Sequence, residues 1–267
     1  MSQIYRFMSF ESFVDLVQTK SLVFANPTSW EDPRELEPVD IWIHEKLLQL
    51  EDAGLARLLE YTTHEIRKRK LYAQCWTALK ESDALWRIYY HDGFAVRVSI
   101  NTADLKRLDN VIMEKVHYLD NFFKLTERFD YKQIFCVKRK AFAHEKEIRL
   151  LHQYRFKDAK DLEQQAITML MAIQSSDGSS KKNIAHSLYK NMSIEESLND
   201  INNRMQYTFF QEPTKAISFA HIPQFIKSVM LSPFAPDWFD KTVDTYCGVH
   251  SIKYLGKSSL YKDIPEI

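Results

Sequence analysis

Two glutamates and an arginine lie close together in the middle of the chain, at Glu145, Glu147 and Arg149. Their alternation with basic and apolar neighbours predicts a half-buried β-strand. Residues two apart on a strand point to the same face, so the three charged groups are expected side by side, with Ile148 and Leu150 buried on the other face. Carboxylates held together beside a guanidinium can differ in pKa and act as an acid/base pair. The alternative interpretation is a solvated strand face with one Glu–Arg ion pair.

The composition is that of an ordinary soluble globular protein. Of 267 residues, 45% are hydrophobic and 27% are charged, and a chain of this length can form one large domain or a domain with insertions. Lys plus Arg and Asp plus Glu both number 36, so no overall basic field attracts nucleic acid. Because there are only five glycines and no glycine-rich phosphate loop, a Rossmann dehydrogenase or a P-loop enzyme is not expected.

The three cysteines, Cys75, Cys136 and Cys247, are widely spaced and form no CxxC pair. This usage predicts reduced thiols in a cytoplasmic protein. No His/Cys cluster has the spacing of a zinc site, so no metal is expected. The amino-terminal residues lack the apolar segment of a signal peptide, and no apolar run approaches the roughly 18 residues of a membrane span. We therefore expect a cytoplasmic protein, bacterial in general character, with no membrane segment.

Strand and helix patterns intermix along the chain without the regular rhythm of βαβ units. This order predicts an α+β fold with a mainly antiparallel or mixed sheet and flanking helices. Strands are expected at residues 3–8, 21–25, 71–77, 94–100, 112–118, 133–138, 145–153, 217–220 and 226–231. Helices are expected directly after Ser9, over 40–70 with a break near Gly54, at 82–90 and at 237–246.

The region from residue 157 to 212 differs in character from the rest. Residues 158–174 and 193–206 have helical patterns, and the polar, Gly- and Ser-rich stretch 175–182 between them is the strongest linker signal in the chain. We interpret 157–212 as a helical insertion within a single α+β domain that spans 1–267. Such an insertion could serve as a lid or as a surface for a protein partner.

Three other segments have two interpretations each. Aromatic side chains crowd Trp86-Arg87-Ile88-Tyr89-Tyr90, which is typical of a core, and the alternative is a stacking wall for a base or a nicotinamide ring. Trp30-Glu31-Asp32-Pro33 is typical of a turn anchored by its tryptophan, although its acidic pair could border a pocket. The basic run Arg67-Lys68-Arg69-Lys70 is typical of a solvated helix face, and contact with nucleic acid stays open.

Five segments, taken in order, resemble the uncharacterised bacterial domain-of-unknown-function family 2971. They are Tyr5-Arg6-Phe7-Met8-Ser9; Leu22-Val23-Phe24-Ala25-Asn26-Pro27 with Trp30-Glu31-Asp32-Pro33; Cys75-Trp76-Thr77 with Leu85-Trp86-Arg87-Ile88-Tyr89; Lys140-Ala141-Phe142-Ala143-His144-Glu145-Lys146-Glu147-Ile148-Arg149; and Ser232-Pro233-Phe234-Ala235-Pro236-Asp237-Trp238-Phe239. The terminal Lys257-Ser258-Ser259-Leu260 fits the same pattern, so the matches extend from residue 5 to about residue 260, and their joint order is specific. The family is uncharacterised, so this resemblance implies no activity.

The order of three features is similar to that of arginine-type ADP-ribosyltransferases. Those enzymes carry an early Arg, a middle strand bearing Ser or Thr, and a late Glu-x-Glu. This chain has Arg6, then Cys75-Trp76-Thr77, then Glu145-Lys146-Glu147. Cys-Trp-Thr stands where that class has Ser-Thr-Ser.

This second resemblance implies NAD as a co-substrate and no metal. Arg6 would bind a phosphate of the cofactor through a charge-assisted fork, and Thr77 would brace the nicotinamide ribose. Glu147 would hydrogen-bond a ribose hydroxyl and stabilise oxocarbenium-like charge, while Glu145 would orient or deprotonate the acceptor. The remaining residues expected to line the same cleft are Tyr5 and Trp76.

Three classes of function follow from these patterns. The first is an NAD-consuming transferase or glycohydrolase that takes a nucleotide-type small molecule, such as a phage-defence or toxin-like effector. The second is a non-enzymatic binding or regulatory protein that uses 157–212 as its partner surface. The third, a nuclease or another nucleic-acid enzyme, has the least support because no cluster of Asp or Glu has metal spacing. Convergence of Arg6, Thr77 and Glu147 in one cleft would favour the first class, and their dispersal would favour the second.

Overall fold

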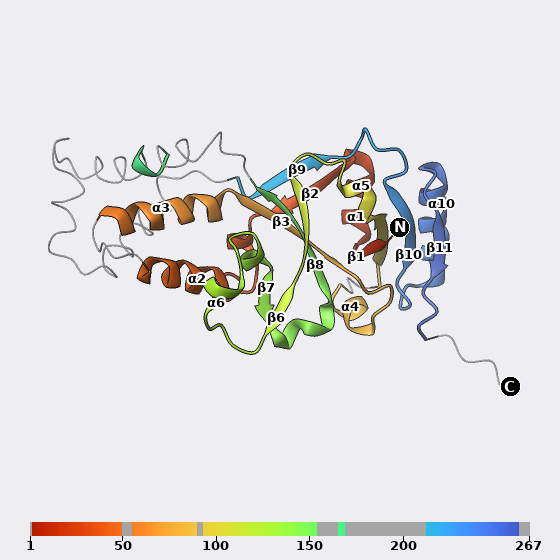
Figure 1. Cartoon of the computed structure of the whole chain (residues 1–267). Coiled ribbons are helices and arrows are strands. Elements are labelled where there is room, and N and C mark those ends of the chain that lie inside the picture. Colours follow the sequence, from red (N-terminus) through yellow and green to blue (C-terminus); the bar gives the residue numbers. More distant parts are fainter. Residues whose placement is uncertain (1, 50–54, 90–92, 154–164, 169–211, 262–267) are drawn as a thin grey trace.

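The computed structural model describes residues 2–49, 55–89, 93–153, 165–168 and 212–261. At its centre, nine described strands form a mixed, mostly antiparallel sheet flanked by helices (Figure 1). This architecture confirms the predicted α+β fold. The strand order is β11-β10-β4-β1-β3-β2-β9, and β8 pairs with both β3 and β5. A separate parallel pair consists of β6 and β7.

The elements follow the sequence pattern closely over most of the chain. The strands are β1 (Gln3–Ser9), β2 (Ser21–Ala25), β3 (Leu71–Thr77), β4 (Ala95–Asn101), β5 (Val111–Lys115), β6 (His117–Leu119), β7 (Val137–Arg139), β8 (Glu147–Gln153), β9 (Thr214–Ser218), β10 (Ile226–Leu231) and β11 (Tyr254–Lys257). The α-helices are α1 (Phe10–Thr19), α2 (Glu37–Leu48), α3 (Leu55–Arg69), α4 (Asp83–Ile88), α5 (Thr102–Leu105), α6 (Leu125–Arg128) and α10 (Asp237–Val249), and the 3₁₀ helices are η1 (Pro27–Ser29), η2 (Gln133–Cys136) and η3 (Lys140–Glu145).

Strand β3 is the branch point of the sheet. One of its edges pairs with β8 along the whole strand, which places Thr77 opposite Glu147. Its other edge meets β2 at the single pair Ala25–Ala73 and meets β1 at the single pair Tyr5–Thr77. The carboxyl end of β3 therefore lies between β1 and the beginning of β8, and this is where the candidate site forms.

Local sequence signals set the course of the first strand and helix. Ser9 ends β1, and its hydroxyl accepts a hydrogen bond from the backbone N–H of Ser12 at 3.2 Å, which satisfies a free donor of α1. The apolar side of α1 buries Phe13, Leu16 and Val17 against the sheet. With α1 packed in this way, β1 pairs with β4 over its full length.

Strand β8 begins at Glu147, two residues later than the sequence predicts. Glu145 is the last residue of η3, and Lys146 adopts a left-handed conformation with φ 45° that turns the chain into the strand. The prediction that Glu145 shares a strand face with Glu147 and Arg149 is therefore wrong. The two-residue periodicity of a strand does not apply across a turn.

The prediction of a half-buried strand is also wrong, because β8 is buried on both faces. Ile148 and Leu150 are buried in the main core, as expected. Glu147 and Arg149 on the other face are only 4% and 2% exposed. That second face is covered by the hydrophobic cluster that contains side chains of α2 and η2, including Leu151 of the strand itself.

Two other predicted strands have different structures. The segment 112–118 divides into β5 and β6, because β5 pairs with β8 while β6 pairs with β7. Residues 133–136 form η2 instead of a strand, and only Val137–Arg139 is extended. The side chains of Ile134, Phe135 and Cys136 are all buried, and a strand with one covered face cannot bury three consecutive side chains.

The two hydrophobic clusters lie on opposite faces of β3 and β8. The main core joins α1, α10 and the strands, and Trp76 belongs to it. The second core joins α2, η2 and β7 around Trp42 and Phe135. Strands β3 and β8 thus run between two packed layers (Figure 1), and a charged side chain on them needs partners inside the protein.

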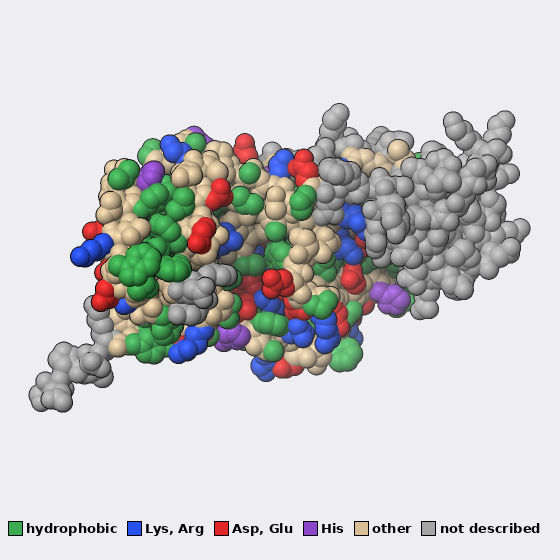
Figure 2. All heavy atoms as spheres, turned by 180° about the vertical axis from the view of Figure 1, so that it is seen from behind, with side chains coloured by type: hydrophobic (Ala, Val, Ile, Leu, Met, Phe, Trp, Pro, Cys, Tyr) green, Lys and Arg blue, Asp and Glu red, His purple; other side chains and the backbone are tan. Residues whose placement is uncertain are grey.

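The predicted insertion at 157–212 lies outside the described residues, apart from 165–168, which are helical, and 212. Seen from behind, hydrophobic side chains gather at the end of the molecule that carries α10 and β11 (Figure 2). Exposed apolar residues at or beside these elements include Trp238 and Leu255. In the described part of the chain, no helix combines the length and the hydrophobicity needed to cross a bilayer.

Candidate functional site

A pocket opens at the end of β3, beside β1 and the beginning of β8. Its cavity volume is about 50 Å³, well below the roughly 300–1,000 Å³ that small-molecule sites occupy, so a ligand of nucleotide size would extend out of it into solvent. The sequence-derived site residues all line it: Tyr5, Arg6, Trp76, Thr77, Glu145 and Glu147. Helix α4 supplies another wall through Leu85 and Ile88, followed by Tyr89.

Arg6 is a cation of the pocket that has no ion-pair partner among the described residues. Its side chain is half-buried on β1, and burial lowers the pKa of its guanidinium, while the nearby Tyr89 phenol and Cys75 thiol act in the opposite direction. Within the described residues, no hydrogen bond or ion pair holds this guanidinium. A half-buried guanidinium with no carboxylate partner is suited to an anionic ligand.

Glu147 is held by cations other than Arg6. Its Oε1 accepts from Arg149 Nε at 2.7 Å, and its Oε2 accepts from Lys138 Nζ at 3.1 Å. Arg149 also donates to a carboxylate oxygen of Glu35, and its Nη1 donates to the carbonyl of Phe135 at 2.6 Å. Arg6 and Glu147 converge on one pocket, as the first class of function requires, but no ion pair joins them in the described part of the chain.

The electrostatics fix Glu147 in its ionised form. Burial raises the pKa of Glu147, but Arg149 and Lys138 outweigh burial and lower it to about 2. The Cys75 thiol also lowers the pKa of this carboxylate, and its own pKa is raised well above the ordinary value by burial and by the charge of Glu147. Glu147 can thus stabilise positive charge near neutral pH, whereas Cys75 is a protonated thiol and a poor nucleophile.

Glu145 is more accessible than Glu147, with 20% of its side chain exposed. Its Oε2 accepts from Lys138 Nζ at 2.8 Å. Thr77 fixes the backbone below it, because the Thr77 hydroxyl donates to the carbonyl of Glu145 at 2.6 Å and accepts from the N–H of Leu79 at 3.0 Å. A hydroxyl has one donor, so Thr77 cannot also donate to a ribose, and what it does in this structure is position Glu145.

Trp76 contributes packing to the site. Its side chain is buried in the main core, and its indole N–H donates to Gln74 Oε1 at 2.8 Å. Tyr5 lies under the guanidinium of Arg97, 4.8 Å from ring centre to the guanidinium carbon. Tyr89 also lines the pocket, and burial followed by the nearby Cys75 raises the pKa of its phenol, so it is a neutral donor.

The aromatic run at 86–90 divides into core and pocket. Trp86 is fully buried and meets Phe7 edge to face at 4.7 Å between ring centres. Ser82 begins the short helix α4 by accepting from the N–H of Leu85 at 3.3 Å. This cap brings Tyr89 to the pocket at the far end of the helix. The core interpretation therefore holds for Trp86, the stacking-wall interpretation stays a prediction for Tyr89, and Tyr90 lies outside the described residues.

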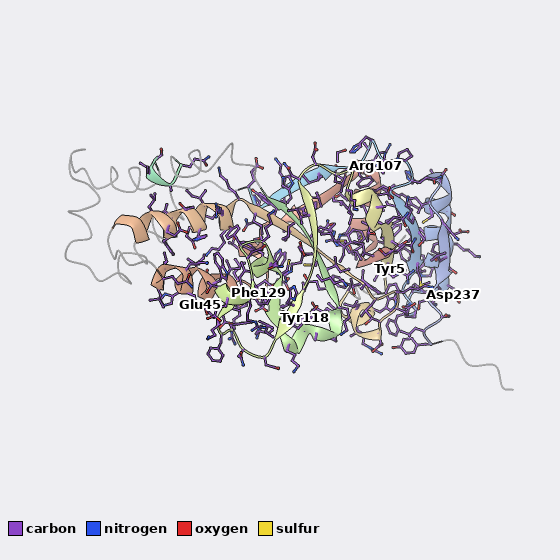
Figure 3. The ribbon with its side chains drawn as sticks, in the orientation of Figure 1. Tyr5, Glu45, Arg107, Tyr118, Phe129 and Asp237 are labelled. Carbon is purple, nitrogen blue, oxygen red and sulfur yellow. The ribbon has the colours of Figure 1, made fainter. Side chains whose placement is uncertain are left out.

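Sequence reasoning missed Glu35, Lys138 and Tyr118. Glu35 and Lys138 complete the charge cluster, and Tyr118 accepts from the backbone N–H of Glu147 at 2.7 Å (Tyr5 and Tyr118 are labelled in Figure 3). Glu35 stands two residues after the Trp30–Pro33 segment, in which Asp32 pairs with Arg139 at 2.7 Å. The acidic residue after that turn was the one sequence feature that could have pointed to Glu35. Nothing in the spacing indicates that its partner is Arg149.

The basic run Arg67–Lys70 has partners within the chain. Lys68 contacts Asp40 at 2.9 Å and Glu65 at 2.7 Å. Arg67 lies over the ring of Tyr131 at 5.1 Å, and Lys70 donates to Gln165 at 2.8 Å. These contacts within the chain account for the presence of the basic run.

Among the described residues, no group of three or more His, Cys, Asp or Glu side chains is arranged to hold a metal ion. Comparisons of the chain with protein-family models, with curated proteins and with solved structures found no match. The resemblances to family 2971 and to ADP-ribosyltransferases therefore stay predictions.

Proposed function

We propose that this chain binds an NAD-type dinucleotide at the pocket, most of it lying outside the small cavity, and cleaves its nicotinamide–ribose bond, as an ADP-ribosyltransferase or a glycohydrolase. The observation that carries the proposal is the convergence of Arg6, Glu145 and Glu147 on one pocket, with Arg6 lacking a described partner. Among the three classes of function considered, the NAD-consuming transferase is the one that employs an arginine early in the chain together with a late pair of glutamates.

Arg6 would bind a phosphate of the dinucleotide. Its guanidinium can form two parallel hydrogen bonds to one phosphate, and no described carboxylate has to be displaced first. Tyr89, beside it, would donate to the same ligand or pack against a ring.

The glutamates would act on the ribose. The cluster of Glu35, Glu145 and Glu147 with Lys138 and Arg149 has three carboxylates and two cations, so one negative charge is left over. That excess would stabilise an oxocarbenium-like ribose. The bond between ribose C1′ and the nicotinamide nitrogen breaks, its electron pair leaves with nicotinamide, and water or another acceptor attacks C1′ and loses its proton toward Glu145 or solvent.

The test is incubation of the purified protein with NAD, followed by chromatographic measurement of nicotinamide and ADP-ribose with and without acceptor proteins. Release by the wild type, reduced at least about tenfold in Arg6→Gln, supports the proposal, because a charge-assisted hydrogen bond contributes ~1.5–3 kcal/mol. Arg128→Gln, the same substitution at an exposed arginine, is the control and should keep wild-type turnover. NAD that neither stabilises the protein nor is cleaved contradicts the proposal.

The second candidate is a non-enzymatic nucleotide-binding protein. It is favoured by one observation, namely that both oxygens of Glu147 already accept from Arg149 and Lys138, which is what a purely structural buried ion pair requires. Thermal stabilisation by NAD without release of nicotinamide would place this candidate ahead. A protein partner at 157–212 stays a separate prediction.

A further inference from the structure

Lys138 occupies the centre of the charge cluster, although it belongs to no sequence motif. Its Nζ lies 2.8 Å from Glu145 Oε2, 3.1 Å from Glu147 Oε2 and 4.0 Å from Glu35 Oε2. The side chain comes from β7 and is 13% exposed. The ring of Phe142 covers it at 4.5 Å from Nζ to the ring centre.

The two glutamates depend on this amine in different degrees. Glu147 has Arg149 as a second cation at 2.7 Å. Glu145 contacts Lys138 and no other cation among the described residues. Two carboxylates that accept from the same Nζ are close enough that, without the amine between them, one would take up a proton at a higher pH than an isolated carboxylate does.

We propose that Lys138 is a positioning residue that joins Glu145 to Glu147 and keeps both carboxylates ionised, so that the pocket works by stabilising positive charge and not by donating protons. This inference rests on the proposed function only for the identity of the ligand whose positive charge the two carboxylates stabilise. The contacts of Lys138 with Glu145 and Glu147 do not depend on any ligand.

The surrounding groups leave no other described residue for this task. Arg149 faces Glu147 and Glu35 from β8, and Arg6 reaches neither glutamate in an ion pair. The remaining titratable groups that face the pair from the neighbouring elements β3, β6 and α4 are Cys75, Tyr118 and Tyr89. All three have raised pKa values, chiefly through burial, and are therefore neutral near pH 7.

The arrangement has a consequence for the bond that can be broken. Every described partner of the Glu145 and Glu147 carboxylates is a donor, so neither carboxylate holds a proton to give to a leaving group. The leaving group would then depart without a proton from either carboxylate. A pyridinium-type N-glycoside meets this condition, because the bond's electron pair neutralises the charge on its nitrogen.

The experiment compares Lys138→Met, which keeps length and removes charge, with Lys138→Arg, which keeps charge. Glutamate labelled with ¹³C at the side-chain carboxyl is incorporated, and the carboxyl signals are followed by NMR from pH 3 to pH 8. In Lys138→Met we expect a carboxyl titration at least about one pH unit above any in the wild type, which disappears when Glu145→Gln is added. Lys138→Arg should titrate as the wild type does.

A Lys138→Met variant that is folded and shows no new titration overturns the inference, and so does the same new titration in Lys138→Arg. A loss of thermal stability alone would indicate an ordinary structural ion pair. This measurement needs no substrate, so it decides the role of Lys138 even if NAD proves not to be cleaved. If NAD is cleaved, the pH dependence of nicotinamide release should gain the same ionisation in Lys138→Met.

Discussion

Replacing Glu147 by Gln tests how strongly the ionised carboxylate stabilises the fold. The amide keeps the shape of the side chain but removes the charge that Arg149 and Lys138 bind at 2.7 and 3.1 Å. The pKa of Glu147 is lowered from 4.5 to about 2, against the opposing effect of burial. At ~1.36 kcal/mol per pH unit, this difference corresponds to about 3 kcal/mol of stability.

The sign of the pH dependence follows from the direction of the shift. Because the folded-state pKa lies below the unfolded-state value, the stability due to Glu147 is fully present above about pH 4.5 and is lost as the pH falls toward 2. Glu147→Gln should therefore lower the free energy of unfolding by about 3 kcal/mol at pH 7, and by only about 1 kcal/mol at pH 3. Urea unfolding followed by circular dichroism at both pH values gives the two differences.

Glu145→Gln is the matched control. Its carboxylate has one described cation partner and is 20% exposed, against 3% for the Glu147 side chain, so a smaller loss is expected. The reasoning is refuted if Glu147→Gln costs less than about 1 kcal/mol at pH 7, or if its cost does not shrink in acid. Loss of turnover in Glu147→Gln bears on catalysis only at temperatures where the variant remains folded.

Three further predictions separate groups that hold the fold from groups that face a ligand. Arg6→Gln should leave the free energy of unfolding within about 0.5 kcal/mol of the wild type. Arg149→Gln should lower it by about 3–5 kcal/mol, because it leaves buried carboxylates unpaired. Equal losses of the two variants in urea unfolding would contradict this prediction. Thr77→Val keeps the shape but removes two hydrogen bonds, so it should lower the free energy of unfolding by about 1–3 kcal/mol and speed hydrogen exchange at the Leu79 amide. Unchanged exchange would argue against the hydrogen bonds of Thr77 fixing this backbone. Cys75 should react with iodoacetamide much more slowly at pH 8 than an unperturbed thiol, because burial and Glu147 raise its pKa. Mass spectrometry of the modified peptide measures the rate. Modification at the rate of a free thiol would contradict the prediction, because it would show that the thiol is accessible and ionisable.

Strong periodic signals made most of the elements predictable. The strand at residues 21–25 and the strand at 71–77 have the predicted bounds, and the cap at Ser9 begins α1. The predictions were wrong where the tertiary structure covers a second face. Residues 133–136 bury three consecutive side chains in η2, and β8 buries charged residues that its alternation assigned to solvent.

The sequence by itself determined which strands carry the pocket residues, because Arg6, Thr77 and Glu147 all lie in segments with clear strand patterns. The pairing of β3 with both β1 and β8 then brings the three residues together. Only the tertiary structure decided what those residues can do. Partners of a buried charge come from elements remote in sequence, as Glu35 and Lys138 do for the glutamate–arginine pair, and no local pattern encodes them. That pairing satisfies Glu147 and leaves Arg6 without a described partner. The sequence determines which charged residues surround the pocket, and the fold determines which of them pair with one another.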